Sequence, residues 1–136
     1  MHVANLIRKN WGSRPKTAWL AIPFLGVACT LPTFYIFAKN PTSAYHLSLA
    51  LSYPNVEDAE RGLREGLITK AQHDQIVRAI QIRKASPQYT PLGGLIHIHG
   101  NGAQSDWTWG CVALENGDIK ELYDAVDVGT PVTIKP

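Results

Sequence analysis

The chain has 136 residues, of which 45% are hydrophobic and 18% charged, so it is long enough for one domain with its own core, with or without a short extension. Thirteen basic against eleven acidic residues leave a formal net charge of +2, which gives no reason to expect a nucleic-acid partner. The two cysteines, Cys29 and Cys111, are too few for a disulfide framework and form no C-x-x-C pair or Cys/His cluster that suggests structural zinc.

The N-terminal segment, residues 1–32, combines a basic head with an apolar run. Its first sixteen residues hold four Lys or Arg and no acid, and no further charge occurs before Lys39. This layout is typical of a secretory signal or membrane anchor, with membrane contact through residues 17–37. Pro23 and Pro32 interrupt the run, which favours buried strands or an irregular apolar segment instead. Both interpretations stay open.

Short strands are predicted downstream of this segment. Residues 33–37 are aromatic and β-branched, which favours a strand, and a turn cluster at 40–43 follows them. Residues 45–51 alternate apolar with small or polar side chains, as a half-buried strand does. Two more strands are expected at 95–99 and 132–134.

Three helices are expected among these strands. Asn55 is a suitable N-cap for a helix over residues 56–65, and Thr69 for a second helix over 70–84. A third helix is expected over residues 118–126. The predicted fold is therefore mainly β, a small sandwich or mixed barrel with two short inserted helices and one C-terminal helix.

The residues suited to chemistry follow the strand that ends at His99. Gly100 and Gly102 permit a turn with positive φ, and Cys111 comes directly after Gly110. A free thiol has a pKa of about 8.5, so it needs a base or a cation nearby to act as a thiolate at neutral pH. A glycine before the nucleophile lets a substrate carbonyl approach backbone N–H groups that can receive an oxyanion. Taken alone, one His and one Cys at this spacing are weak evidence for catalysis.

Two histidines compete for the role of base. His97 and His99 point to the same face of the strand, because side chains alternate, so alternation cannot choose between them. Their Cα atoms lie about 6.6 Å apart, too far for both to serve one thiol at once. We expect His99 to be the base, because it precedes Gly100, where the loop to Cys111 begins. His97 is then expected one step deeper, in a structural role.

These motifs resemble those of the L,D-transpeptidase catalytic domain family. Ile98-His99-Gly100 is similar to its histidine motif and Thr108-Trp109-Gly110-Cys111 to its nucleophile motif. The start of the following helix at 116–119, the closing strand at 129–134, and segments at 40–49 and 53–55 are similar as well. The resemblance covers roughly residues 33–136, which are expected to form the catalytic domain.

The resemblance implies a cysteine acyltransferase, or a related amidase, that attacks an amide of a peptidoglycan stem peptide. Cys111 would form a thioester and pass it to an amine or to water, with His99 as base and Gly110 as backbone support for the oxyanion. The expected substrate-binding residues are Gly100, Thr108, Trp107 and Trp109, although aromatic residues beside a strand, such as these two tryptophans, are more often core. The resemblance implies no metal and no organic cofactor. It also implies a role in cell-wall biogenesis and in the maintenance of cell shape, in the periplasm or cell envelope of a bacterium.

Two departures from the family pattern leave other hypotheses open. Trp109 and Ala113 stand where many members carry a second His and an Arg, and residues 1–32 resemble nothing in the domain. The chain is therefore also compatible with an inactive or truncated relative that binds cell-wall peptides. A third hypothesis is a membrane-anchored interaction protein localised by residues 1–32.

Overall fold

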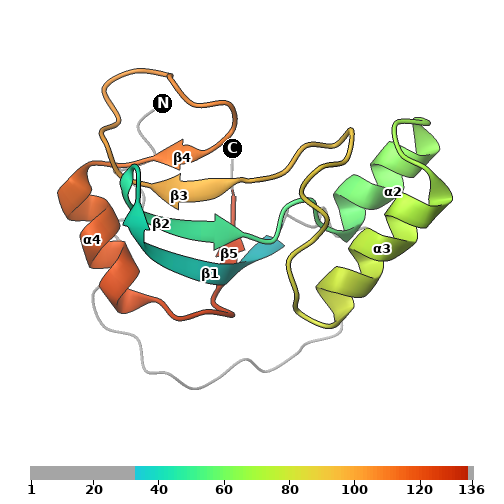
Figure 1. The fold of residues 1–136 in the computed structure, drawn as a ribbon, viewed down its shortest axis with the longest axis horizontal. Helices are drawn as coiled ribbons and strands as arrows, with labels where there is room; N and C mark the ends of the chain where they lie inside the picture. The colour runs from blue at the N-terminus through green and yellow to red at the C-terminus, as the bar shows by residue number, and fades with distance from the viewer. Residues whose placement is uncertain (1–32, 135–136) are drawn as a thin grey trace, which may run out of the picture. The chain divides into compact units, whose positions relative to one another are not determined.

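The computed structural model describes residues 33–134, so Cys29 and both interpretations of the N-terminal segment lie outside the described residues. The described part holds one five-stranded mixed sheet and three helices (Figure 1). The strands are β1 (Thr33–Ser43), β2 (His46–Leu51), β3 (His97–His99), β4 (Val112–Ala113) and β5 (Pro131–Thr133), and the helices are α2 (Val56–Arg64), α3 (Lys70–Gln81) and α4 (Asn116–Ala125). The predicted fold class, mainly β with two inserted helices and one C-terminal helix, is confirmed.

The strand order explains how the loop that carries Cys111 returns to the sheet. The order is β4-β3-β2-β1-β5, and every adjacent pair is antiparallel except β3 and β4. In that parallel pair Ile98 lies beside Val112 and His99 beside Ala113. Because parallel strands need a crossover, residues 100–111 run from the end of β3 back to the level of its start.

One face of the sheet carries the core. Leu49 and Ile98 are register partners on that face, while Ser48, His97 and His99 point to the opposite face. The helix α4 packs against β2 and closes the core (Figure 1). Burying each Leu or Ile side chain contributes about 1.5–3 kcal/mol. The core cluster consists of Phe34, Ile36, Leu49, Leu51, Ile98, Leu114, Ile119 and Val126.

The helices α2 and α3 form a hairpin with its own small cluster of buried side chains, Ala59, Ile68 and Ile76. The predicted caps are confirmed: Asn55 and Thr69 each form a capping box with the residue three positions on. The helix α3 ends at Gln81, before the expected residue 84, because Arg83 has φ +53° in the left-handed region. Within residues 33–134 no helix is long and apolar enough to cross a bilayer.

Candidate active site around Cys111 and His99

Aromatic rings and a backbone carbonyl hold the imidazole of His99, which is only 3% exposed. Tyr45, in the turn between β1 and β2, stacks on it at a centroid distance of 4.7 Å, and Trp107 meets it edge-on at 5.3 Å. Its Nδ1 lies 2.7 Å from the carbonyl oxygen of Gly100. Because a carbonyl only accepts, Nδ1 carries the proton and Nε2 of the neutral ring keeps its lone pair. This is the tautomer that a general base requires.

The Nε2 atom of His99 is available to a reactant. It makes no hydrogen bond to another residue in the range 33–134. It is also not sealed from solvent, because every fully buried side-chain nitrogen or oxygen in the described part has a partner. The lone pair on Nε2 can therefore receive a proton from a group that enters the site.

Gly100 fixes the end of β3 between the β1–β2 hairpin and α4. Its amide donates to the carbonyls of Tyr45 and Leu47 at 3.0 and 3.2 Å. A Cβ atom at this position would lie 2.9 Å from the Tyr45 oxygen and 2.6 Å from Oδ1 of Asn116, so the packing requires glycine. Asn116 also accepts from the amide of Asn101 at 2.8 Å. The peptide unit between Gly100 and Asn101, whose carbonyl orients His99, is thus hydrogen-bonded to the first residue of α4.

Two side chains brace the loop that carries the cysteine. The indole N–H of Trp107 donates to the Gly102 carbonyl at 3.1 Å, which keeps this ring against His99. The hydroxyl of Thr108 donates to the carbonyl of Cys111 at 2.7 Å. Both bonds join residues three to five positions apart, so the loop is shaped by its own side chains.

Cys111 is a free cysteine with a partly exposed side chain. Its Sγ lies 3.5 Å from the carbonyl oxygen of Leu95, to which the thiol donates. Within the described residues no hydrogen bond joins Cys111 to His99. The thiol must turn away from Leu95 to meet Nε2 of His99, and catalytic hydrogen bonds commonly tighten only when substrate binds.

Gly110 gives the backbone before the nucleophile an unusual conformation. Its φ of +123° is open to glycine alone, and a Cβ atom would lie 3.1 Å from the side chain of Ile96. The amide N–H groups of Gly110 and Cys111 make no hydrogen bond to another residue within 33–134. Two free donors beside a nucleophile are suited to hold an oxyanion.

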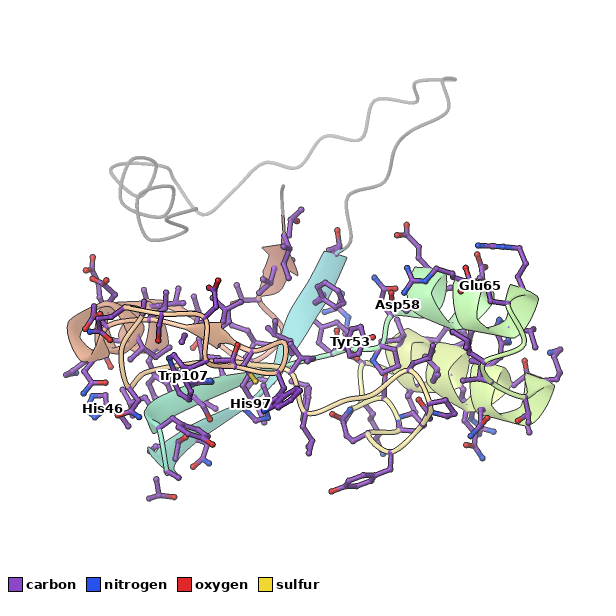
Figure 2. The ribbon with its side chains drawn as sticks, turned by 90° about the horizontal axis from the view of Figure 1, so that it is seen from above. His46, Tyr53, Asp58, Glu65, His97 and Trp107 are labelled. Atoms are coloured by element: carbon purple, nitrogen blue, oxygen red, sulfur yellow. The ribbon has the colours of Figure 1, made fainter. Side chains whose placement is uncertain are left out.

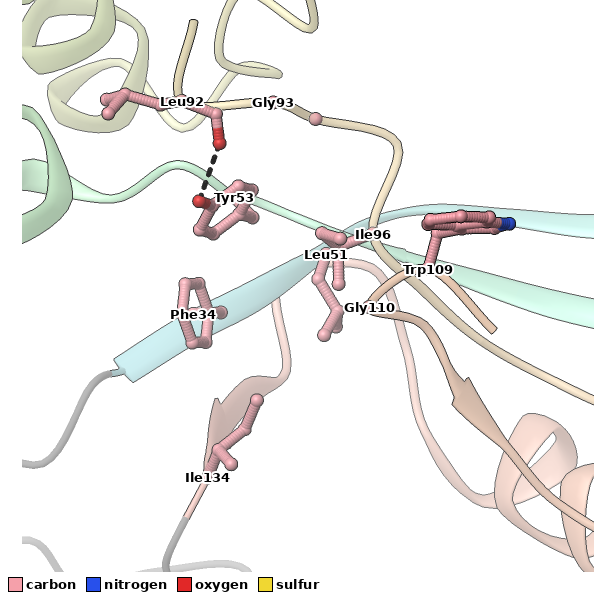
Figure 3. A pocket seen from close by; sticks show the side chains of 10 residues that line it. Phe34, Leu51, Tyr53, Leu92, Gly93, Ile96, Trp109, Gly110 and Ile134 are labelled. Atoms are coloured by element: carbon pink, nitrogen blue, oxygen red, sulfur yellow. Dashed lines mark hydrogen bonds between the residues drawn. The ribbon is translucent and has the colours of Figure 1, made fainter. Parts of the chain in front are cut away.

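A cavity of about 390 Å³ opens beside the nucleophile loop (Figure 3). Tyr53 closes one wall, where its hydroxyl donates to the Leu92 carbonyl at 2.7 Å. Burial raises the pKa of Tyr53, and the nearby carboxylate of Asp58 adds to this, so the hydroxyl remains a donor. No charged side chain lines the cavity, so it suits an apolar group. Its lining consists of Phe34, Leu51, Tyr53, Leu92, Gly93, Gly94, Ile96, Trp109, Gly110 and Ile134.

His97 lies on the same face of β3 as His99. Its Nδ1 is 3.4 Å from the hydroxyl oxygen of Ser48 on β2. Burial lowers the pKa of His97, and the neighbouring charge of His99 lowers it further, so His97 is neutral at neutral pH. Figure 2 shows His97 and Trp107 on the sheet side of the described chain, away from Asp58 and Glu65 on the helical hairpin.

The remaining described histidines lie away from this site. His46 is exposed in the β1–β2 hairpin, and Nδ1 of His73 lies 2.9 Å from Asp74 on α3. Among residues 33–134, no three His, Cys, Asp or Glu side chains come together as metal ligands would. Cys111 directly precedes β4, which pairs with β3, the strand that carries His97 and His99.

Comparison with known proteins identifies the family. The family model described as the L,D-transpeptidase catalytic domain (YkuD) matches residues 10–134, which is more than half of the chain. The chain belongs to the L,D-transpeptidase catalytic domain family. The match starts well upstream of β1 and so reaches into the segment that the sequence resemblance left out. Neither a search of curated proteins nor a search of solved structures found a match.

L,D-transpeptidases act on peptidoglycan, outside the cytoplasm. The predicted site residues of this L,D-transpeptidase domain lie at the end of β3 and in the loop that follows it. Trp107 packs on His99, and Thr108 fixes the backbone of Cys111. Trp109 is fully exposed and lines the cavity. Gly100 is buried, and its carbonyl orients His99. The roles of these residues in substrate binding stay predictions.

Three residues of the candidate site are not predicted as such from the sequence. Tyr45 is expected in a strand and in the family-like segment 40–49 with no role of its own, yet its ring covers His99. Leu95 supplies the carbonyl that holds the thiol. Glu115 accepts from the amide of Ala103 at 3.1 Å and so ties the loop to α4. No local pattern marks any of the three, because each acts through a contact between distant parts of the chain.

Proposed function

We propose that this chain is a peptidoglycan L,D-transpeptidase that forms a thioester between Cys111 and a stem peptide. His99 is the general base and acid, and the N–H groups of Gly110 and Cys111 hold the oxyanion. The stem peptide binds along the cysteine loop, with an apolar part in the cavity lined by Tyr53, Trp109 and Ile96. The acyl group then passes to an amine or to water, in the periplasm or cell envelope of a bacterium.

The proposed reaction proceeds in two proton-balanced halves. Nε2 of His99 takes the proton from Cys111, and the thiolate sulfur attacks the amide carbon. As the C–N bond breaks, the imidazolium returns this proton to the leaving amine, and a thioester remains. In the second half His99 takes a proton from the incoming amine or water, which attacks the thioester carbon. The thiolate leaves and recovers the proton from His99.

The orientation of His99 is the observation that carries this proposal. A buried imidazole whose Nδ1–H donates to a carbonyl, and whose Nε2 is free, supports a base rather than a packing residue. The supporting residues lie on both sides of the ring, on the β1–β2 turn and on the cysteine loop. A protein that only bound wall peptides would need no such tautomer.

Turnover of purified peptidoglycan by the full chain tests the proposal. We expect chromatography with mass spectrometry to detect muropeptides changed at a stem-peptide amide. Cys111→Ser and His99→Ala should each lower this rate by at least 10²-fold, in line with loss of nucleophile or general base. Treatment with a chelator should leave the rate unchanged. His73→Ala, on the distant helix α3, is the matched control and should retain the rate.

Two outcomes would contradict the proposal. Turnover that persists in Cys111→Ser would exclude Cys111 as the nucleophile. A correctly folded wild-type chain that binds muropeptides without changing them would favour the inactive, peptide-binding relative instead.

A further inference from the structure

The strand register places a second imidazole beside the nucleophile. Ile98 lies beside Val112 and His99 beside Ala113 in the parallel pair of β3 and β4. Continued one step back along both strands, this register puts Cys111, which directly precedes β4, at the level of His97. His99 lies about 6.6 Å farther along β3, at two strand residues.

The hydrogen bond of the Cys111 thiol is consistent with a position at the level of His97. Sγ of Cys111 donates to the carbonyl of Leu95, which is two residues before His97 and four before His99. The carbonyl that holds the sulfur is therefore nearer in sequence to His97 than to His99, the proposed base.

The ring of His97 has its Nδ1 on the side of β2. In an imidazole the two nitrogens lie on opposite sides of the axis through Cβ and Cγ. Nδ1 lies 3.4 Å from Oγ of Ser48 on β2, and β3 runs between β2 and β4. The opposite edge of the ring, formed by Cδ2 and Nε2, is thus the one toward β4, the strand that Cys111 directly precedes. Nε2 makes no hydrogen bond to any residue within 33–134.

The surroundings keep this imidazole neutral. Burial lowers the pKa of His97, and the charge on His99 lowers it further. On the shared face β2 contributes Ser48 and Ala50, which do not titrate, and β3 contributes His99. The register of β3 and β4, continued one step back, adds Cys111. When the Ser48 hydroxyl donates to Nδ1, the remaining proton of the neutral ring is on Nε2.

We propose that His97 is a positioning residue of the cysteine site, whose Nε2–H donates a hydrogen bond to the sulfur of Cys111 and stabilises the thiolate. The proton released by the thiol goes to His99, and His97 itself gives up none. The role of His97 in turnover rests on the proposed function, whereas its effect on the free thiolate does not. This gives His97 more than the structural role expected from the sequence.

The pH dependence of Cys111 alkylation by iodoacetamide in the full chain tests this inference. The label is assigned by peptide mass spectrometry, because the sequence also contains Cys29. His97→Phe keeps a ring but no donor, and should raise the midpoint of the pH–rate profile by about one pH unit, the size expected for loss of a hydrogen bond to a charged group. His97→Gln places an amide N–H near the position of Nε2 and should restore most of the shift. His73→Gln on α3 is the matched control.

An unchanged midpoint in folded His97→Phe would overturn the inference. If that variant does not fold, Ser48→Ala carries the test, since it frees the His97 ring and should move the midpoint in the same direction. An unchanged midpoint there would also overturn it. Alkylation needs no peptidoglycan, so the expected shift in a wild-type chain without turnover would contradict the proposed function alone. Turnover without the shift would contradict the role of His97 alone.

Discussion

At the scale of single residues, the two imidazoles of β3 differ in their partners. His99 donates through Nδ1 to the Gly100 carbonyl and is enclosed by Tyr45 and Trp107. His97 is half-buried and has the hydroxyl of Ser48 as its partner. Two residues of the same type, one step apart on one face, are therefore suited to different tasks. One can exchange a proton, and the other stays neutral.

The lowered pKa of His97 predicts a pH dependence of stability. Burial disfavours its charged form in the folded chain, so below the ordinary value of 6.5 the unfolded chain binds more protons. The contribution of His97 to the free energy of unfolding should fall as the pH drops from 7.5 through 6.5 toward its lower folded-state pKa. In His97→Gln this component is absent. Denaturant titrations of both chains from pH 8 to pH 5 should show the wild type losing stability relative to the variant, and parallel curves would contradict this origin.

At the scale of elements, the end of β3 depends on close contact with the β1–β2 hairpin and with α4. Gly100 makes this contact possible, since its amide reaches the Tyr45 carbonyl and its Cα faces Asn116 and Ile119. The same residue supplies the carbonyl that orients His99. Packing of the elements and orientation of the base therefore share one position.

A pair of glycine substitutions tests this coupling. In Gly100→Ala the added Cβ would overlap the Tyr45 carbonyl and the Asn116 side chain, which should lower the free energy of unfolding by about 1–3 kcal/mol. It should also slow peptidoglycan turnover, because the carbonyl beside His99 moves. The control is Gly117→Ala in α4, where a Cβ meets no atom within 4 Å and should stabilise the helix by about 0.5–1 kcal/mol. Equal effects of the two substitutions would contradict the packing argument.

Local elements could be predicted from the sequence, and elements made by long-range contacts could not. The caps Asn55 and Thr69 act on residues three positions away, so their helices were predicted with correct starts. The predicted end of α3 is too late, because the sequence shows neither the left-handed backbone of Arg83 nor the hydrogen bond from the Tyr35 hydroxyl to the Lys84 carbonyl at 2.8 Å. The two-residue strand β4 was missed, since it exists only through pairing with β3.

The same distinction applies to the candidate site. The glycines beside His99 and Cys111 are visible as sequence motifs, and Gly110 has the expected kind of positive φ. The expectation of a positive φ was wrong for Gly100, which is required instead by its packing against Tyr45 and Asn116. The ring that stacks on His99 belongs to Tyr45, more than fifty residues upstream, and this contact depends on the register between β2 and β3. The partner of the thiol, the Leu95 carbonyl, is a backbone atom that no residue pattern can mark.

At the scale of the whole described unit, two hydrophobic clusters are present. The sheet and α4 enclose the larger cluster, and the α2–α3 hairpin encloses the smaller one. Hydrogen bonds from Tyr53 to the Leu92 carbonyl and from Ser86 to the Pro54 carbonyl, at 2.7 and 2.8 Å, link the two. The candidate catalytic residues all belong to the sheet side.

Truncation of one fully buried isoleucine in each cluster should separate stability from activity. Ile76→Ala and Ile119→Ala each remove a side chain with no exposed surface, and each should lower the free energy of unfolding by about 2–5 kcal/mol. Ile119 packs against Gly100, so only its truncation should also lower the rate of peptidoglycan turnover in the folded fraction. Denaturant titration and turnover at a temperature where both variants are folded give the comparison. Equal loss of turnover in both would contradict a site confined to the sheet side.

The central claim is that Cys111 carries the acyl group, and the intact mass of the protein tests it most directly. After the chain is mixed with purified muropeptides and quenched in acid, we predict a mass gain equal to the muropeptide minus its leaving amine. Peptide mapping should place the adduct on Cys111, and neutral hydroxylamine should remove it, as expected for a thioester. Cys111→Ser should show no such labile adduct. A folded, thiol-reactive wild-type chain that turns over muropeptides with no adduct on Cys111, or with the adduct on another residue, would contradict the claim.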